Sequence, residues 1–243
     1  MDRPAEESTV AHPAGAATLK GVLALVPAHD EGPRIAAVVA GARAHLPVLV
    51  VDDGSADDTA DRARAAGATV LRQQPNRGKG AALQAGFRRA LEDGWEAVVT
   101  LDADGQHDPA EIPRFLDAWR EGQPDLVIGR RDFRRMPPSR RLATEFGGRA
   151  FSWAVGRKIP DNQSGYRLLS RRLMAEMIRS EESGFELEVD MIVVCLRAGW
   201  PVAWVPIRTI YAGEPSHIRP IRHVTGFFRT VRHARSRMRA PGP

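Results

Sequence analysis

Short apolar runs that alternate with helical patterns constrain the fold of this chain more than any other feature. Nearly continuous apolar runs are typical of strands buried on both faces, and strands separated by helices form a parallel sheet with helices on both sides. The sequence therefore predicts an α/β fold with a doubly wound, mostly parallel sheet. The expected strands cover 22–26, 48–51, 69–71, 97–101 and 125–128, and the expected helices cover 33–44, 56–66, 80–92 and 111–119.

The rest of the chain has a more mixed pattern. Ser55 is the expected N-cap of the helix over 56–66, and Gly67 is expected to end it. Two further helices are expected over 138–156 and 185–199. An extended segment is expected over 202–210, interrupted at Pro206.

Length and charge predict one domain with basic additions. With 243 residues, 43% of them hydrophobic, the chain suits a single compact domain with a small elaboration. The net charge is +5, and basic residues concentrate in 130–158 and 207–243, which indicates an anionic partner. We expect 1–19 to be disordered and 216–243 to form a basic amphipathic segment, helical over 221–238. This segment either lies on an anionic membrane surface or packs its apolar stripe on the domain as a solvated helix.

The cellular setting follows from what the sequence contains. The single cysteine, Cys195, lies in an apolar helical pattern and is expected to be a packed thiol, which suits a reducing cytoplasm. No apolar run reaches the roughly 20 residues that a membrane-spanning helix needs. We therefore expect a cytoplasmic protein, with peripheral attachment to the inner face of the membrane as an option.

Acidic residues follow three of the expected strands. Asp30 and Glu31 follow the first, Asp52 and Asp53 end the second, and the Asp102-Ala103-Asp104 stretch follows the fourth. In wound parallel sheets, ligands bind beyond the carboxyl ends of the strands. Two carboxylates spaced i, i+2 on an extended strand end share one face and form a hard-oxygen site for Mg²⁺ or Mn²⁺, which would grip a diphosphate. The alternative interpretation is a solvated acidic turn.

A glycine-rich stretch, Asn76-Arg77-Gly78-Lys79-Gly80, precedes the third helix. It resembles the end of a P-loop, but Gln73 stands where that motif needs glycine. The stretch is expected to be a turn whose backbone N–H groups favour an anion, with Lys79 nearby. A plain N-cap turn is the alternative. No Gly-x-Gly-x-x-Gly follows the first strand, so a nicotinamide site is not expected.

Together, these motifs resemble family 2 inverting glycosyltransferases with a GT-A fold. Downstream motifs narrow the resemblance to the dolichol-phosphate mannose synthase and polyprenyl-phosphate glycosyltransferase branch, over about residues 20–230, with the GT-A domain expected over 20–215. The motifs are Val26-Pro27-Ala28-His29-Asp30-Glu31, Val50-Val51-Asp52-Asp53-Gly54-Ser55, Asn76-Arg77-Gly78-Lys79-Gly80, Asp102-Ala103-Asp104-Gly105-Gln106, Asp161-Asn162-Gln163-Ser164-Gly165-Tyr166-Arg167, Gly184-Phe185-Glu186-Leu187-Glu188 and Val205-Pro206-Ile207.

The resemblance implies a role for particular residues at the donor site. A metal and the diphosphate would be held by Asp102, Asp104 and Gln106. The nucleotide-sugar would be bound by Pro27, Ala28, His29, Glu31, Asp52, Asp53, Lys79 and Ala103. One departure lies here, because many relatives have Tyr-Asn where this chain has His29-Asp30.

The resemblance also implies an acceptor site. The acceptor phosphate would be bound by Arg130, Arg141, Ser164, Arg167 and His217, with Gln163 in the same loop as Ser164. Many relatives have Ser-Lys where this chain has Ser216-His217, and histidine is only partly charged near neutral pH. Glu188 is expected near the metal or a sugar hydroxyl, or else as a helix cap.

The predicted reaction is metal-dependent, inverting transfer of a hexose from GDP-mannose or a UDP-hexose to a polyprenyl phosphate, with Asp102, Asp104 and Arg130 as catalytic residues. A phosphate acceptor is already mostly ionised and needs no strong base. A second hypothesis sends the sugar to the hydroxyl of a soluble glycan or metabolite, which requires a base such as Asp161 or Glu188. A nucleotidylyltransferase and a nucleic-acid-binding protein are more distant alternatives. With 6% aromatic residues and no binding module, nucleic acid is not an expected partner.

Overall fold

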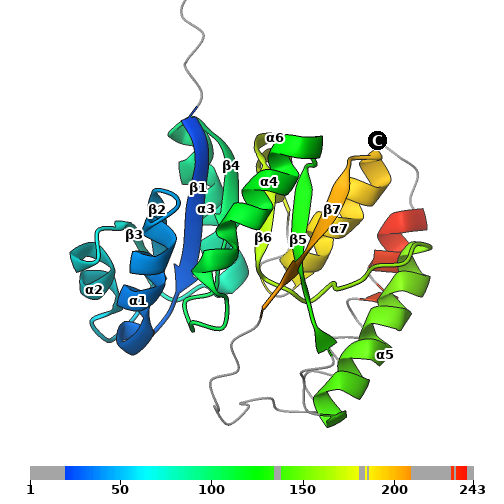
Figure 1. Cartoon of the computed structure of the whole chain (residues 1–243), viewed down its shortest axis with the longest axis horizontal. Coiled ribbons are helices and arrows are strands. Elements are labelled where there is room, and N and C mark those ends of the chain that lie inside the picture. The colour runs from blue at the N-terminus through cyan, green and yellow to red at the C-terminus, as the bar shows by residue number, and fades with distance from the viewer. Residues whose placement is uncertain are drawn as a thin grey trace, which may run out of the picture.

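In the part of the chain that the structure describes, seven strands form one sheet with helices on both faces (Figure 1). The computed structural model describes residues 20–133, 138–180, 184, 186–208, 231–232 and 234–239. The strand order is β3-β2-β1-β4-β6-β5-β7. Pairs are parallel except for those that β6 makes with β4 and β5, which are antiparallel. The predicted α/β fold with a mostly parallel sheet is confirmed.

The first half of the chain builds four neighbouring strands. Its elements are β1 (Lys20–Ala28), α1 (Gly32–Arg43), β2 (Val48–Asp53), α2 (Thr59–Ala65), β3 (Thr69–Gln73), α3 (Lys79–Glu92) and β4 (Trp95–Thr100). The second half contains η1 (Pro109–Glu111), α4 (Ile112–Gly122), β5 (Leu126–Arg131), α5 (Pro138–Val155), β6 (Arg167–Ser170), α6 (Arg171–Met177), α7 (Glu186–Ala198) and β7 (Val202–Ile207).

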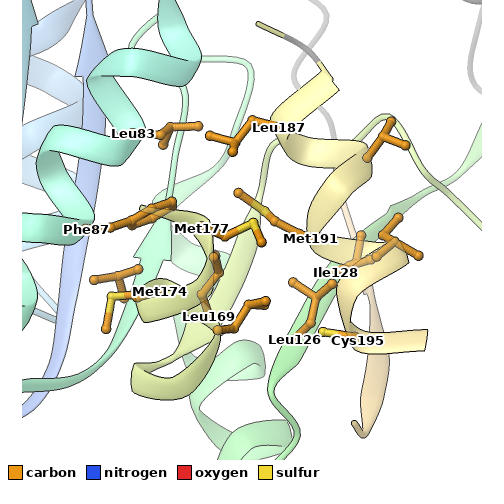
Figure 2. Packing of buried hydrophobic residues seen from close by; sticks show 14 of the residues in the cluster. Leu83, Phe87, Leu126, Ile128, Leu169, Met174, Met177, Leu187, Met191 and Cys195 are labelled. Atoms are coloured by element: carbon orange, nitrogen blue, oxygen red, sulfur yellow. The ribbon is translucent and has the colours of Figure 1, made fainter. Parts of the chain in front are cut away.

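Two apolar clusters, one on each face of the sheet, make the core. Alternate side chains of β1 enter different clusters: Leu23 and Leu25 pack on one face, and Ala24 and Val26 on the other. Figure 2 shows the first cluster, where side chains of α3, α6 and α7 meet those of β5 and β6. Cys195 lies in this cluster, and burial raises the pKa of its thiol to about 12, so it is the packed, unreactive thiol that the sequence predicts.

Three local predictions need correction. The helix predicted over 56–66 begins at Thr59 with Asp58 at its N-cap, because the Ser55 hydroxyl instead accepts a hydrogen bond from the Asp30 N–H at 3.0 Å. The strand near the chain end is not interrupted at Pro206 but continues to Ile207. Proline is tolerated there because β7 is an edge strand. Finally, β6 and α6 were not predicted.

Parts of the chain lie outside the described residues. Among them are 1–19, His217 and most of the helix expected over 221–238, of which 231–232 and 234–239 are described and helical. Within the described residues, no helix combines the length and apolar character needed to cross a bilayer.

Candidate active site

A cavity of about 380 Å³ opens beyond the carboxyl ends of β1, β2 and β4. Parallel strands present the loops that follow them at the same edge of a sheet, which explains why residues far apart in sequence meet here. Except for Asp52, every residue predicted to bind the nucleotide-sugar lines this cavity. The lining residues are Pro27, Ala28, His29, Glu31, Asp53, Asn76, Gly78, Lys79, Ala82, Asp102, Ala103 and Asp104.

The two carboxylates of Asp102 and Asp104 lie in a turn after β4, not on the strand end as predicted, because β4 ends at Thr100. Oδ1 of Asp104 accepts a hydrogen bond from the Gln106 N–H at 2.9 Å. The Asp102 N–H donates to Nδ1 of His107 at 3.0 Å. The turn therefore holds both carboxylates at the cavity through its own backbone.

Lys79 links the turn after β4 to helix α7. Its Nζ lies 2.5 Å from Oδ1 of Asp102 and 3.0 Å from Oε1 of Glu188, which is in the first turn of α7. Burial alone would raise the pKa of Asp102, but the charge of Lys79 and smaller contributions from His107 and Arg131 lower it to about 2. Burial alone would lower the pKa of the Lys79 amine, but the two carboxylates of Asp102 and Glu188 raise it. Asp102 and Lys79 are therefore both ionised at neutral pH.

The loop over 161–166 packs against these three charged groups. A Cβ built at Gly165 would lie 3.0 Å from Nζ of Lys79 and 3.1 Å from both Oδ2 of Asp102 and Oε1 of Glu188. The Thr100 hydroxyl anchors the loop by donating to the Gly165 carbonyl at 2.7 Å. Any larger residue at Gly165 would push into the charged cluster, so the close approach requires glycine.

An aromatic stack supports the turn that carries Asp102 and Asp104. The ring of His107 lies 4.9 Å from that of Tyr166, which in turn stacks on Phe115 at 4.4 Å. The Tyr166 hydroxyl donates to the Asp108 carbonyl at 3.1 Å. Burial lowers the pKa of His107, and because Nδ1 accepts a hydrogen bond, the neutral ring carries its proton on Nε2.

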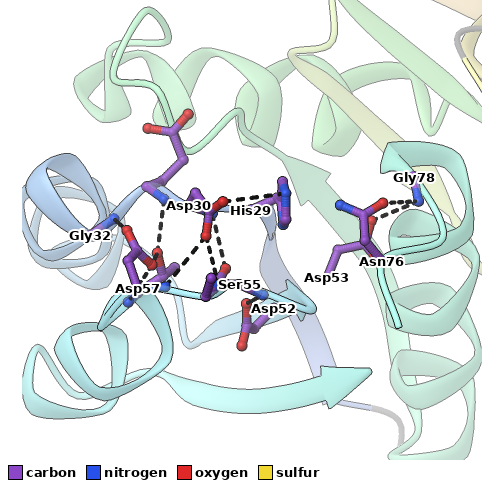
Figure 3. Close-up of polar contacts among 12 residues, drawn as sticks. His29, Asp30, Gly32, Asp52, Asp53, Ser55, Asp57, Asn76 and Gly78 are labelled. Carbon is purple, nitrogen blue, oxygen red and sulfur yellow. Dashed lines mark hydrogen bonds and ion pairs between the residues drawn. The ribbon is translucent and has the colours of Figure 1, made fainter. Parts of the chain in front are cut away.

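Asp53 holds the glycine-rich loop in place. Its carboxylate accepts hydrogen bonds from the Arg77 N–H at 2.8 Å and from Nε2 of Gln73 at 2.6 Å. It also accepts from the Gly78 N–H at 2.7 Å (Figure 3). Gly78 has φ of 91°, a conformation that favours glycine. The backbone N–H groups of Arg77 and Gly78 do bind an anion, as predicted, but that anion is the carboxylate of Asp53, so these two N–H groups are already bonded within the protein.

The placement of Asp52 does not suit the predicted contact with a nucleotide. Its side chain is fully buried, accepts from the Ser55 N–H at 3.0 Å and forms an ion pair with Nε of Arg72 at 3.0 Å. Asp52 therefore stabilises the loop after β2. His29 is different, because its side chain is 45% exposed at the cavity, with Nε2 3.5 Å from Oδ2 of Asp30 (Figure 3).

The arginines at the end of β5 differ from each other in their surroundings. Arg130 is exposed. Arg131 is largely buried and makes a two-point contact with Asp161, Nε to Oδ2 at 2.8 Å and Nη2 to Oδ1 at 2.9 Å. Because side chains alternate along a strand, the two arginines leave opposite faces of the sheet. The charge of Arg131 lowers the pKa of Asp102, so Arg131, which the sequence did not predict, belongs to the electrostatic surroundings of the site.

The other predicted acceptor residues lie in varied settings. Arg141 is exposed on α5 and pairs with Glu145 at 2.7 Å. Arg167 is fully buried, and its guanidinium donates to the carbonyls of Ser164, Glu188 and Asn162, which does not suit contact with a phosphate. The Ser164 hydroxyl is buried and makes no hydrogen bond within the described residues.

Sequence reasoning missed Arg131, His107 and Tyr166. Side chains alternate between the two faces of β5, so Arg131 could have been distinguished from Arg130 only if the face toward the site had been known. Tyr166 lies in the motif over 161–167, and its contact with His107 joins two motifs whose proximity no spacing rule predicts.

A mostly parallel sheet of this order, with an acidic cavity at the ends of β1, β2 and β4, defines a glycosyltransferase of the GT-A class. The chain belongs to glycosyl transferase family 2, whose sequence profile matches residues 24–177. It is 33% identical over 204 residues to the undecaprenyl-phosphate mannosyltransferase of Micrococcus luteus, covering 76% of this chain and 82% of the relative. It is 32% identical over 218 residues to the polyprenol monophosphomannose synthase of Mycolicibacterium smegmatis, covering 83% and 82%.

These relatives confirm the branch that the sequence motifs predicted. A solved structure with a similar fold is glucosyl-3-phosphoglycerate synthase from Mycobacterium tuberculosis, crystallised with Mn²⁺, UDP-glucose and phosphoglyceric acid. It superposes with a TM-score of 0.68 and 25% identity, covering 91% of this chain and 80% of that one.

Proposed function

We propose that this enzyme moves a hexose, with inversion, from a nucleotide-diphosphate sugar to a polyprenyl phosphate. The observation that carries the proposal is the cavity in which Asp102 and Asp104 lie beside residues of β1, β2 and α3. The names of the Micrococcus luteus and Mycolicibacterium smegmatis relatives support a polyprenyl phosphate acceptor. Donors of both kinds, GDP-mannose and UDP-hexose, fit this proposal.

The residues present fit a divalent cation, Mg²⁺ or Mn²⁺. Asp102 and Glu188 already hold a positive charge, the amine of Lys79, between them. Among the described residues, no three histidine, cysteine or acidic side chains converge as a metal site, so Asp102 and Asp104, with Gln106 nearby, would supply the protein's share of the ligands. Mg²⁺ is commonly held by one or two carboxylates plus substrate phosphates. When bound, such an ion neutralises charge on a departing diphosphate.

Lys79 suits a second role toward the donor. It lines the cavity, and its amine carries a full charge at neutral pH. A diphosphate entering the cavity would offer Lys79 new oxygens in place of Asp102, which would release that carboxylate for the cation. His29 and Glu31 would then face the nucleoside.

A phosphate acceptor fits the site better than a hydroxyl acceptor. Hydroxyl transfer requires a general base, and the two predicted candidates are engaged: Asp161 by Arg131, and Glu188 by Lys79. A phosphate monoester loses its second proton near pH 6, so cationic groups need only hold it in line. We assign this role to Arg130, which is exposed at the end of β5, with Arg141 and the buried Ser164 hydroxyl as further contacts.

The proposal places the enzyme where a lipid phosphate is presented, at the inner surface of the membrane. It is tested by thermal shift with GDP and UDP, each with and without Mn²⁺, because a ligand that binds only the folded state raises the melting temperature. One nucleotide should stabilise the protein only with Mn²⁺, and Asp104→Asn should abolish both this shift and transfer to a polyprenyl phosphate. Asp117→Asn, an exposed carboxylate of α4, is the matched control. Retention of Mn²⁺-dependent stabilisation by Asp104→Asn would refute the assignment.

A further inference from the structure

Helix α5 exposes large apolar side chains in a way that no other described element does. Phe146 is 61% exposed and Trp153 is 65% exposed, and among the described residues these are the large apolar side chains that remain in solvent. They are seven residues apart, so they lie on one face of the helix. Exposed apolar side chains gathered on one face mark an interaction surface.

Basic side chains accompany these two aromatic residues. Arg149 lies between them in sequence, one turn from Trp153, and is exposed. Arg157 and Lys158 follow the end of the helix and are also exposed. We call Phe146, Arg149, Trp153, Arg157 and Lys158 the aromatic-basic face. The nearest acidic side chain on the helix, Glu145, is already paired with Arg141.

Trp153 also contacts a cation from another part of the chain. The guanidinium of Arg235, in the helical residues near the chain end, lies 3.6 Å from the centre of the Trp153 ring. One side of the indole is therefore covered by a charged group while most of the side chain stays in solvent. An indole beside cationic groups matches the chemistry of a membrane interface, where aromatic rings sit at the level of the lipid headgroups and basic residues attract anionic lipids.

The position of α5 relative to the active site agrees with this chemistry. The helix is the next element after β5, whose last residues are Arg130 and Arg131, and Figure 1 shows it beside the tip of that strand. We propose that the aromatic-basic face binds the surface of an anionic lipid bilayer. The inference deepens the proposed function and rests on it in one respect, since a lipid acceptor gives the enzyme a reason to lie on a bilayer.

The test is sedimentation of the full chain with vesicles. We expect binding to phosphatidylglycerol–phosphatidylcholine vesicles and much weaker binding to pure phosphatidylcholine. Phe146→Ser should weaken binding by about tenfold through lost apolar burial. Arg149→Glu should weaken it by at least about fivefold. Arg88→Glu, the same charge reversal at an exposed position of α3, is the matched control and should bind as the unchanged chain does.

Transfer to a short, water-soluble prenyl phosphate separates the two proposals. Phe146→Ser and Arg149→Glu should transfer at the unchanged rate, because neither residue lines the cavity. If the unchanged chain binds anionic vesicles but glycosylates no prenyl phosphate, the proposed function fails and the membrane face stands. If both variants bind vesicles as the unchanged chain does, the membrane face is overturned. It is also overturned if Phe146→Ser converts a dimer to a monomer in analytical ultracentrifugation, which would make this face a contact between copies.

Discussion

At the scale of single residues, Arg167 shows how a residue that supports the site differs from one that contacts substrate, because its guanidinium is fully buried. Its three carbonyl partners belong to the 161–166 loop and to α7, the two segments that meet over Lys79. A group used in this way positions the loop, and its full burial does not suit contact with a phosphate. Arg130 has the opposite surroundings, because it is exposed.

We expect Arg167→Met to destabilise the protein, because it leaves buried carbonyls without donors at a cost of about 3 kcal/mol in the free energy of unfolding. The melting temperature should fall by roughly 6–12 °C. Arg130→Met should leave melting unchanged and instead raise KM for the acceptor. Scanning calorimetry and acceptor kinetics on both variants test this prediction. An Arg167→Met enzyme with an unchanged melting temperature but a raised KM for the acceptor would show that Arg167 contacts the acceptor phosphate.

Lys79 provides a second prediction at this scale. If its amine competes with a metal ion for Asp102, Lys79→Met should bind Mn²⁺ about tenfold more tightly in the absence of nucleotide, since a neighbouring positive charge is removed. The same variant should bind a nucleoside diphosphate with Mn²⁺ more weakly. Isothermal titration calorimetry measures both affinities, and Lys158→Met serves as the control. Weaker binding of Mn²⁺ alone would contradict the competition.

Sequence reasoning succeeded in grouping residues that follow the strands, and it failed where the face of a strand on which a side chain lies decides its role. Asp102, Asp104 and His29 could be placed at one cavity because the topology of a parallel sheet requires it. Arg130 and Arg131 could not be separated, since the strand that carries them is buried on both faces and shows no polar alternation. The internal use of Asp52 was equally invisible, because its partner Arg72 belongs to the next strand.

At the scale of elements, the helical residues 234–239 are part of the domain's packing. Ala234 is fully buried, and Arg237 forms an ion pair with the buried carboxylate of Asp190 on α7. Asp190 also accepts from the Ser180 hydroxyl at 2.9 Å. The basic segment predicted to lie on a membrane therefore directs Arg235 and Arg237 toward the protein, to Trp153 and Asp190.

Loss of this ion pair should be measurable as a loss of stability. Arg237→Met leaves the buried Asp190 without its cation, which costs about 3 kcal/mol and lowers the melting temperature by roughly 6–12 °C. Arg239→Met removes the same charge from an exposed position two residues away and should leave melting unchanged. Equal melting of the two variants in calorimetry would show that the segment does not contribute to stability.

Among the described strands, β6 is the one that the sequence did not predict, and it is also the one that makes the sheet mixed instead of fully parallel. β6 has four residues, three of them fully buried, and its pattern merges with the helix that follows. Its antiparallel direction brings its first residue, not its last, to the edge where the other strands end. The 161–166 loop reaches the active site for that reason, and no local pattern in the sequence encodes the reversal.

For the molecule as a whole, the free energy of unfolding should decrease in two stages as the pH is lowered in the absence of added metal. Burial lowers the pKa of His107, so unfolding takes up a proton once the pH drops below the ordinary value of about 6.5. Asp102, with a pKa of about 2 against an unfolded value of about 3.9, contributes stability that is present above pH 4 and lost between about pH 4 and 2.

Calorimetry from pH 8 to pH 3 tests this order. The melting temperature should begin to fall below about pH 6.5, and His107→Asn should remove that first stage while leaving the decline below pH 4. His45→Asn, at an exposed position just after α1, should keep both stages. A His107→Asn protein that still loses stability between pH 6.5 and 5 would show that another group is responsible.

The direction of β6 also bears on how the enzyme is synthesised. By the time a ribosome has released residue 100, it has made every strand from β1 to β4, yet the outer edge of β4 has no neighbour until residues 167–170 emerge. A nascent chain cut short between these points would present that edge as a template for foreign strands. Truncated products that end before β6 are therefore the ones for which a cell would need chaperones or proteases.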